Sequence, residues 1–160
     1  MTTLDLSFRR DTVRDATLLV ACIAVSFVPG VIGSRFKPDE WYAGLDKSSL
    51  TPPGFVFPIV WTLLYVLMGV ALWRFLRGEP RRRGLGIALF GLQLVLNGMW
   101  SYLFFGLHRP DLALIDIGLL CAATASLVIV FSRENRSAAL LLVPYLAWIG
   151  FAAYLNGAVV

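Results

Sequence analysis

The sequence predicts an all-α membrane protein, a bundle of five transmembrane helices in which a long loop after the first helix acts as a lid. Of the 160 residues, 58% are hydrophobic and 15% are charged, whereas soluble domains average about 45–50% and about 25%. The apolar residues form five runs that approach or exceed the ~20 residues needed to cross a bilayer. Only the first link between runs is long, and we expect a single domain over residues 1–160.

The expected spans cover residues 16–33, 55–76, 84–107, 112–131 and 138–159. The first span follows Arg9, Arg10 and Arg14, and this arrangement resembles a secretory signal peptide. The apolar stretch before Cys22 covers only residues 16–21, however, which is shorter than the roughly 7–15 residues of a signal-peptide core. Because the apolar run continues beyond Cys22, we expect the first helix to be retained.

The arginines predict the orientation in a bacterial cell membrane, whether inner or outer. The N-terminus and the second and fourth links share one side, which collects ten of the 14 basic residues: Arg9, Arg10, Arg14, Arg74, Arg77, Arg81, Arg82, Arg83, Arg133 and Arg136. The other side carries Arg35, Lys37, Lys47 and Arg109. Since positive charge gathers in cytoplasmic loops, we expect a cytoplasmic N-terminus. Basic clusters placed between apolar runs also favour membrane lipid over nucleic acid as a partner.

The long link opens the segment Lys37–Tyr65, around which we expect a pocket to be built. Its loop part contains the following aromatic, basic and proline residues: Trp41, Tyr42, Lys47, Pro52 and Pro53. Exposing the aromatic rings is costly, and the prolines make the loop awkward to fold as a helix. The segment then continues into Trp61 and Tyr65 of the second span. We therefore interpret the loop as an irregular lid above a pocket.

The third span carries two different stripes. At ~100° per residue, the small residues lie together on one side: Gly84, Ala88, Gly91 and Gly98. Small residues let helices approach closely in lipid, so this stripe predicts a helix–helix contact. Gln93, Asn97 and Trp100 lie on the opposite side. Their buried polar groups need partners, which are either neighbouring helices or a ligand.

Unusual residues of several spans recur at one depth beneath the loop. In the last span, Tyr145, Trp148, Ala152 and Asn156 share one face. At ~1.5 Å per residue, the following residues lie roughly 7–15 Å from the loop side: Trp61, Asn97, Trp100, Asp116, Trp148 and Ala152. A carboxyl within a span is costly. Asp116 is therefore either a near-interface acid bonded to a neighbouring helix or a ligand contact.

These groups predict a large, flat, apolar ligand. Aromatic rings stack on flat faces, the amides can bond a polar edge, and Arg35, Lys37 or Lys47 can pair with carboxylates. A porphyrin meets all three conditions, whereas a sterol meets the first two. With His108 as the single histidine, we expect no metal site, no tight haem coordination and no required cofactor. Cys22 and Cys121 lie in apolar runs and form no disulfide framework.

Three motifs resemble the TspO/MBR family, the tryptophan-rich sensory proteins related to the mitochondrial translocator protein. They are WYAGLDK with TPPGFVFPIVWTLLYVLMG, then QLVLNGMWSYLFFGLHRPDLALIDI, then VPYLAWIGFAAYLN. The resemblance covers about Gly30 to Asn156. It implies a five-helix bundle that binds protoporphyrin IX or related tetrapyrroles, sterols and benzodiazepine-type drugs. It also implies roles in tetrapyrrole transport, stress signalling or light-dependent porphyrin breakdown, and a dimer through the third helix.

Carried onto this chain, the resemblance makes Trp61 and Trp148 the catalytic residues if porphyrin breakdown occurs, and Asn97, Trp100 and Ala152 ligand-facing. With the residues above, the expected ligand-binding set is Trp41, Tyr42, Pro52, Trp61, Tyr65, Gln93, Asn97, Trp100, Asp116, Tyr145, Trp148 and Ala152. Two positions depart from the family pattern. Ser48 follows Lys47 where proline is usual, which predicts a looser lid. No basic residue follows Tyr154, so a dedicated cholesterol motif is incomplete.

Four functions remain open from the sequence. The leading hypothesis is a porphyrin-binding sensor, regulator or transporter. The second is a light-dependent enzyme that degrades bound porphyrin, since no acid–base pair, triad or metal site supports another chemistry. The third is a proton-coupled exporter in which Asp116 couples proton movement to transport. The fourth is a packing subunit without a ligand.

Overall fold

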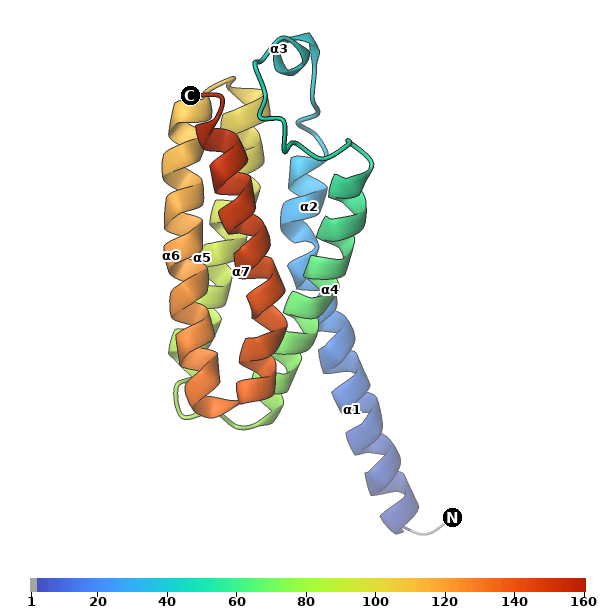
Figure 1. The fold of residues 1–160 in the computed structure, drawn as a ribbon. Coiled ribbons are helices and arrows are strands. Elements are labelled where there is room, and N and C mark those ends of the chain that lie inside the picture. The colour runs from blue at the N-terminus through green and yellow to red at the C-terminus, as the bar shows by residue number, and fades with distance from the viewer. Residues whose placement is uncertain (1–2) are drawn as a thin grey trace.

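The computed structural model describes residues 3–160, with side chains from Thr12 onward, and forms an elongated helical bundle (Figure 1). Within these residues five stretches are long and apolar enough to cross a membrane: Thr12–Gly33, Val56–Arg77, Arg83–Gly106, Pro110–Glu134 and Arg136–Gly157. The predicted five-helix fold class is confirmed. Each expected span lies within about one helical turn of the observed one.

The elements are α1 (Thr3–Ser26), α2 (Val28–Gly33), α3 (Glu40–Ala43), α4 (Val56–Arg77), α5 (Arg83–Ser101), the π-helical turn η1 (Tyr102–Gly106), α6 (Pro110–Glu134) and α7 (Arg136–Gly157). In Figure 1 the loop with α3 lies at the same end of the bundle as the C-terminus. The N-terminus and the α4–α5 and α6–α7 links lie at the other end. We call these the loop end and the arginine end.

The first span is broken into α1 and α2 at Phe27. Pro29 in the first turn of α2 has no N–H to donate, and the Ser26 hydroxyl donates to the Cys22 carbonyl at 2.8 Å. Both features favour a bend. The bend brings α2 against α5, and it also places Gly30 close to the Tyr65 ring of α4. A Cβ at Gly30 would come within 2.7 Å of Tyr65 Cε2, so the close approach requires glycine.

The arginine-end half of the bundle is filled by packed side chains. Phe75 of α4 and Phe131 of α6 stack with their ring centroids 4.0 Å apart, and both are fully buried. A Cβ at Gly86 of α5 would lie 2.4 Å from Phe75 Cζ, so glycine makes room for this pair. Met68 and Leu142 are also completely buried. This filling leaves no large cavity between the helices in the arginine-end half.

The long loop contains one short helix, α3, although the sequence analysis expected an irregular loop there. That prediction was wrong for Glu40–Ala43 because both ends of the turn are capped. Asp39 Oδ1 accepts from the Tyr42 N–H at 3.1 Å, as a helix N-cap does. At the other end, Lys47 Nζ donates to the carbonyls of Tyr42 and Ala43 at 2.7 and 3.1 Å.

Candidate functional site

A cavity of about 780 Å³ lies beneath the long loop, between α2, α4, the α5–η1 segment, α6 and α7. This volume is within the ~300–1,000 Å³ typical of small-molecule sites. Eight residues of the expected ligand-binding set line it: Tyr42, Pro52, Trp61, Tyr65, Asn97, Trp100, Trp148 and Ala152. They come from the loop and three different helices. The structure therefore brings together most of the set in one space.

The other four members of the set lie outside the lining. Trp41 of the loop stacks on His108 of the turn between η1 and α6, with ring centroids 4.4 Å apart. Gln93 and Tyr145 are fully buried one layer below the cavity. Asp116 is 6% exposed on α6, next to Ile117, which does reach the cavity. Asp116, the coupling acid of the exporter hypothesis, does not line the cavity.

A chain of hydrogen bonds forms the floor of the cavity. The Tyr65 hydroxyl donates to Asn97 Oδ1 at 3.0 Å, and Asn97 Nδ2 donates to the Tyr145 hydroxyl at 2.9 Å. That hydroxyl in turn donates to Gln93 Oε1 at 2.9 Å. The chain ties α4, α5 and α7 together. The polar stripe of α5 was expected to bond either neighbouring helices or a ligand. Gln93 bonds a neighbouring helix, whereas Asn97 bonds neighbouring helices and also lines the cavity.

The two indoles facing the cavity from α5 and α7 differ in their N–H groups. Trp100 Nε1 donates to Asn156 Oδ1 at 3.0 Å, and Asn156 Nδ2 donates to the Pro110 carbonyl at 2.8 Å. Trp148 Nε1 is buried and has no hydrogen-bond partner among residues 12–160. A buried donor without an acceptor is costly. Trp148 and Trp100 therefore both present their rings to the cavity, and only the Trp100 N–H is tied to a neighbouring helix.

Trp61 adds a further aromatic surface from α4. Its ring stacks on Tyr65 with centroids 5.4 Å apart and meets the edge of Tyr145 at 6.2 Å. Phe57, one turn away, packs edge-on against Trp148 at 5.9 Å. Trp61 and Trp148 are thus both cavity residues held in place by other rings. A flat apolar molecule in the cavity meets aromatic faces from two helices.

The loop is held to η1 and the following turn by what we call the latch, made of Asp39, Trp41 and His108. His108 Nε2 lies 3.0 Å from Asp39 Oδ2, and the Trp41 ring stacks on the imidazole. Tyr42 packs edge-on against Phe105 at 5.3 Å. The Tyr42 N–H, and after it the nearby His108, holds the pKa of the Asp39 carboxyl below its ordinary value. The latch is therefore built around an ionised Asp39.

Lys47 and Ser48 fix the rest of the loop. Lys47 Nζ donates to three backbone carbonyls and lies 4.7 Å from the centre of the Tyr42 ring. This lysine organises the loop from the cavity wall, whereas Lys37 is an exposed cation at the cavity rim. Ser48, at the position of the expected family proline, lies 3.4 Å from the Tyr154 hydroxyl of α7. Arg35 is absent from the lining.

Sequence reasoning missed several lining residues, chiefly Pro29, Phe57, Phe104 and Phe105. Phe104 follows Trp100 by one helical turn, and this spacing was a usable signal. Phe105 reaches the cavity because η1 contains a π-helical turn, in which the Leu107 N–H donates to the Tyr102 carbonyl at 2.9 Å. Such turns are frequent at functional sites. No sequence pattern used above locates a π-helical turn.

The small-residue stripe of α5 is divided in the structure. Gly84 and Gly91 have open space where a Cβ would lie, and Ala88 is exposed. Gly98 instead faces α2, where its Cβ position is 3.8 Å from Pro29 and Ile32. The first three residues form an outward face that can meet a second copy. Gly98 serves packing within the chain.

Comparison with known proteins places the chain in a family. Residues 18–160 match the TspO/MBR family. A tryptophan-rich protein TspO from Chlorobaculum tepidum is 43% identical over 143 residues, which cover 86% of this chain and 90% of that protein. The tryptophan-rich sensory protein of Cereibacter sphaeroides is 36% identical over 142 residues, 89% of each chain. The translocator protein of Homo sapiens is 39% identical over 131 residues, 78% of each chain.

These matches agree with the five apolar spans and with the three motifs on which the resemblance rested. They support an integral, multi-pass membrane protein of the sensory or translocator kind. The chain is a member of the TspO/MBR family.

Proposed function

We propose that this protein binds protoporphyrin IX or a related tetrapyrrole in the cavity beneath the loop, and acts as a membrane sensor or transporter of that ligand. One observation carries the proposal. The cavity of about 780 Å³ has aromatic walls from three helices, formed by Trp61, Trp100 and Trp148. The names of the relatives, a tryptophan-rich sensory protein and a translocator protein, support the sensing or transport role.

Each part of a porphyrin has a matching group in the cavity. The flat macrocycle stacks against the rings of Trp61 and Trp100. The Trp148 ring adds a third aromatic surface, from α7. Lys37, exposed at the rim, pairs with a propionate carboxylate. Binding then needs no metal and no further cofactor.

A dark titration tests this proposal. Purified protein in detergent is titrated with protoporphyrin IX while tryptophan fluorescence is recorded. We expect saturable quenching in the unmodified protein and a loss of saturable binding in Trp61→Ala and Trp148→Ala. Trp73→Phe is the matched control, because Trp73 lies at the arginine end and outside this cavity. Unchanged binding in both cavity variants would contradict the proposed site.

Light-dependent breakdown of the bound porphyrin is the second candidate function. The observation that favours it is that both tryptophans expected for this chemistry, Trp61 and Trp148, line the same cavity. Molecular oxygen is then the oxidant, and the excited pigment is the source of reactivity. Illumination of the saturated complex in air is expected to produce a new absorption spectrum. Equal bleaching of a variant with Phe at both positions would count against this function.

We also propose a homodimer through the outward face of α5 and a cytoplasmic arginine end. The open Gly84, Ala88 and Gly91 face supports the dimer, since small residues permit close helix contact. The concentration of arginines at the N-terminal end of the bundle supports the orientation. Arg9 and Arg10 contribute to the sequence count but lie outside the described side chains. If the arginine end is cytoplasmic, the C-terminus at the loop end lies on the opposite side of the membrane. Alkaline phosphatase is active only outside the cytoplasm, so we expect a fusion after Val160 to be active, and an inactive fusion would contradict the orientation.

A further inference from the structure

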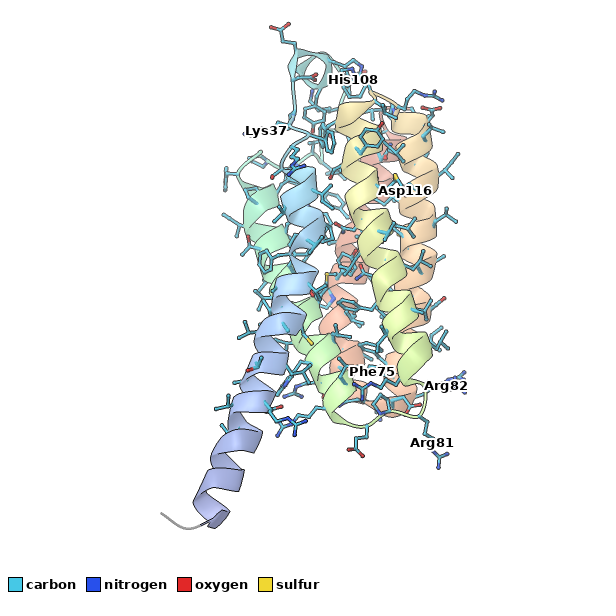
Figure 2. The ribbon with its side chains drawn as sticks, turned by 180° about the vertical axis from the view of Figure 1, so that it is seen from behind. Lys37, Phe75, Arg81, Arg82, His108 and Asp116 are labelled. Carbon is cyan, nitrogen blue, oxygen red and sulfur yellow. The ribbon has the colours of Figure 1, made fainter. Side chains whose placement is uncertain are left out.

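A second pocket lies at the arginine end, far from the cavity beneath the loop. It has a volume of about 270 Å³ and is lined by Trp73, Arg74, Arg77, Gly78 and Asn135. It shares no lining residue with the first cavity. Figure 2 shows Phe75, Arg81 and Arg82 at this end of the bundle, and Lys37 and His108 at the other. The pocket is therefore a separate feature of the molecule.

The two arginines of the pocket are held in place by neighbouring groups. Arg74 Nη1 donates to the Ser137 hydroxyl at 2.8 Å. Arg77 Nε lies 3.3 Å from Asp15 Oδ1, and its guanidinium lies 5.2 Å from the centre of the Trp73 ring. The Trp73 N–H donates to the same Asp15 oxygen at 3.0 Å. The contact of Arg74 with Ser137 and that of Arg77 with Asp15 each use one nitrogen of a guanidinium that carries five N–H donors.

The surroundings of the pocket favour an anion. From Thr12 onward, the arginine end carries Arg14, Arg74, Arg77, Arg81, Arg82, Arg83, Arg133 and Arg136, against Asp15, Glu79 and Glu134. Asn135 caps both the end of α6 and the start of α7, and Gly78 caps the end of α4, so helix ends of both signs meet at the pocket and the excess of arginines sets its charge. The two guanidinium groups, each held by a neighbouring side chain, provide donors suited to phosphate oxygens.

The depth of the pocket favours a lipid over a free anion. Trp73, Arg74 and Arg77 belong to the last turns of the span Val56–Arg77, where the helix leaves the hydrocarbon core. Tryptophan is enriched at this level because its ring is apolar and its N–H is polar. Basic pockets between transmembrane helices on the positively charged side bind anionic lipid headgroups. A headgroup at this level is already held next to the pocket by its acyl chains.

We propose that the Arg74–Arg77 pocket binds the phosphodiester group of an anionic phospholipid, such as phosphatidylglycerol, from the leaflet at the arginine end. The phosphate oxygens accept from both guanidinium groups, and the Trp73 ring packs against the glycerol backbone. The lipid thereby bridges the end of α4 and the start of α7. Its binding stabilises the arginine end and leaves the loop end unchanged.

Native mass spectrometry of the full-length protein, released from detergent with phosphatidylglycerol or phosphatidylcholine added, tests the site. We expect one phosphatidylglycerol retained per chain, and a higher melting temperature with this lipid than with phosphatidylcholine. Arg74→Gln combined with Arg77→Gln is expected to weaken retention on the order of tenfold or more, the equivalent of about 1.4 kcal/mol or more. The matched control is Arg82→Gln combined with Arg133→Gln, which removes the same charge outside the pocket.

The control decides between a site and a general surface charge. Equal loss of retention in the control would overturn the proposal, because a diffuse potential would then explain binding. Full displacement of the lipid by millimolar inorganic phosphate would also overturn it, since the pocket would be a free-anion site. Arg77 contacts Asp15, so the single variant Arg74→Gln, which keeps that pair, is measured alongside. Unchanged protoporphyrin titration in each variant verifies the fold.

Discussion

Two tryptophans of similar position have different physical roles at the cavity. The Trp100 N–H is bonded to Asn156, and Asn156 is bonded in turn to the backbone at Pro110. The Trp148 N–H is buried without a partner among the described side chains. A ring and a hydrogen-bond donor make separable contributions to binding. Replacement by phenylalanine removes the donor and keeps an aromatic surface.

We expect Trp148→Phe and Trp100→Phe to affect different measurements. Trp148→Phe removes a buried donor that has no partner and reduces an aromatic cavity wall, so we expect porphyrin affinity to fall with little loss of stability. Trp100→Phe leaves Asn156 Oδ1 without its donor, and we expect stability to fall by about 1–3 kcal/mol. Dark titration and thermal unfolding of both variants separate the two effects. Equal porphyrin affinity of Trp148→Phe and the unmodified protein would show that the Trp148 indole does not contribute to binding.

Glycine is required where α1 crosses α4. A Cβ at Gly69 would lie 2.5 Å from Ile23 Cα, which is a backbone atom and cannot turn aside. We expect Gly69→Ala to destabilise the protein by about 1–3 kcal/mol, the usual cost of overpacking. Gly118→Ala in α6 is the control, because its Cβ position has nothing within 4 Å. Thermal unfolding of the two variants in the same detergent tests this, and equal melting temperatures would contradict it.

Among the structural elements, the loop depends on the latch between α3 and the turn after η1. Asp39 has two partners there: it caps α3 through Tyr42 and meets His108. Trp41, expected in the pocket, covers His108 instead. The loop is therefore closed over the cavity by a few polar contacts and ring contacts. Changes in these contacts affect access to the cavity more than the bundle itself.

We expect Asp39→Asn to speed porphyrin dissociation several-fold without unfolding the bundle. The folded-state pKa of Asp39 is below its ordinary value, so the latch is fully present above that ordinary value, about 3.9. It is lost as the pH falls through the lower folded-state pKa. Dissociation of bound protoporphyrin, followed by stopped flow from pH 7 to pH 3, is expected to accelerate in the unmodified protein. If protoporphyrin dissociation from Asp39→Asn accelerated between pH 7 and pH 3 as much as dissociation from the unmodified protein, Asp39 would not be the titrating group.

The sequence predicted the elements better than the contacts within the site. Span positions follow from the length of each apolar run, which is local information, and they agree with the structure. Trp61, Asn97, Trp100 and Trp148 reach the cavity as helical spacing predicted. Phe105 reaches the cavity through the π-helical turn η1, and Pro29 reaches it through the break at Phe27. Neither feature follows from the length of an apolar run. Trp41 was misplaced because its partner, His108, is 67 residues away in the chain.

At the scale of the whole molecule, the outward face of α5 is open to a second copy. We expect Gly91→Phe to convert a dimer into a monomer, because a large ring on the Gly84–Ala88–Gly91 face prevents close approach. Gly118→Phe on α6 is the control, since that position is also open. Size-exclusion chromatography with light scattering measures the mass of both variants. A dimer that survives Gly91→Phe would place the interface elsewhere.

The filled arginine-end half has a consequence for how any cargo travels. Below the Tyr65–Asn97–Tyr145–Gln93 chain, Phe75, Met68, Phe131 and Leu142 leave no exposed surface along the bundle axis. Among the described residues, the bundle thus has a cavity at its loop end but no channel along its axis. A molecule that enters the cavity beneath the loop therefore leaves either under the loop or sideways between helices into the leaflet at the loop end. On the proposed function, the pigment therefore enters and leaves the cavity at the loop end rather than passing along the bundle axis.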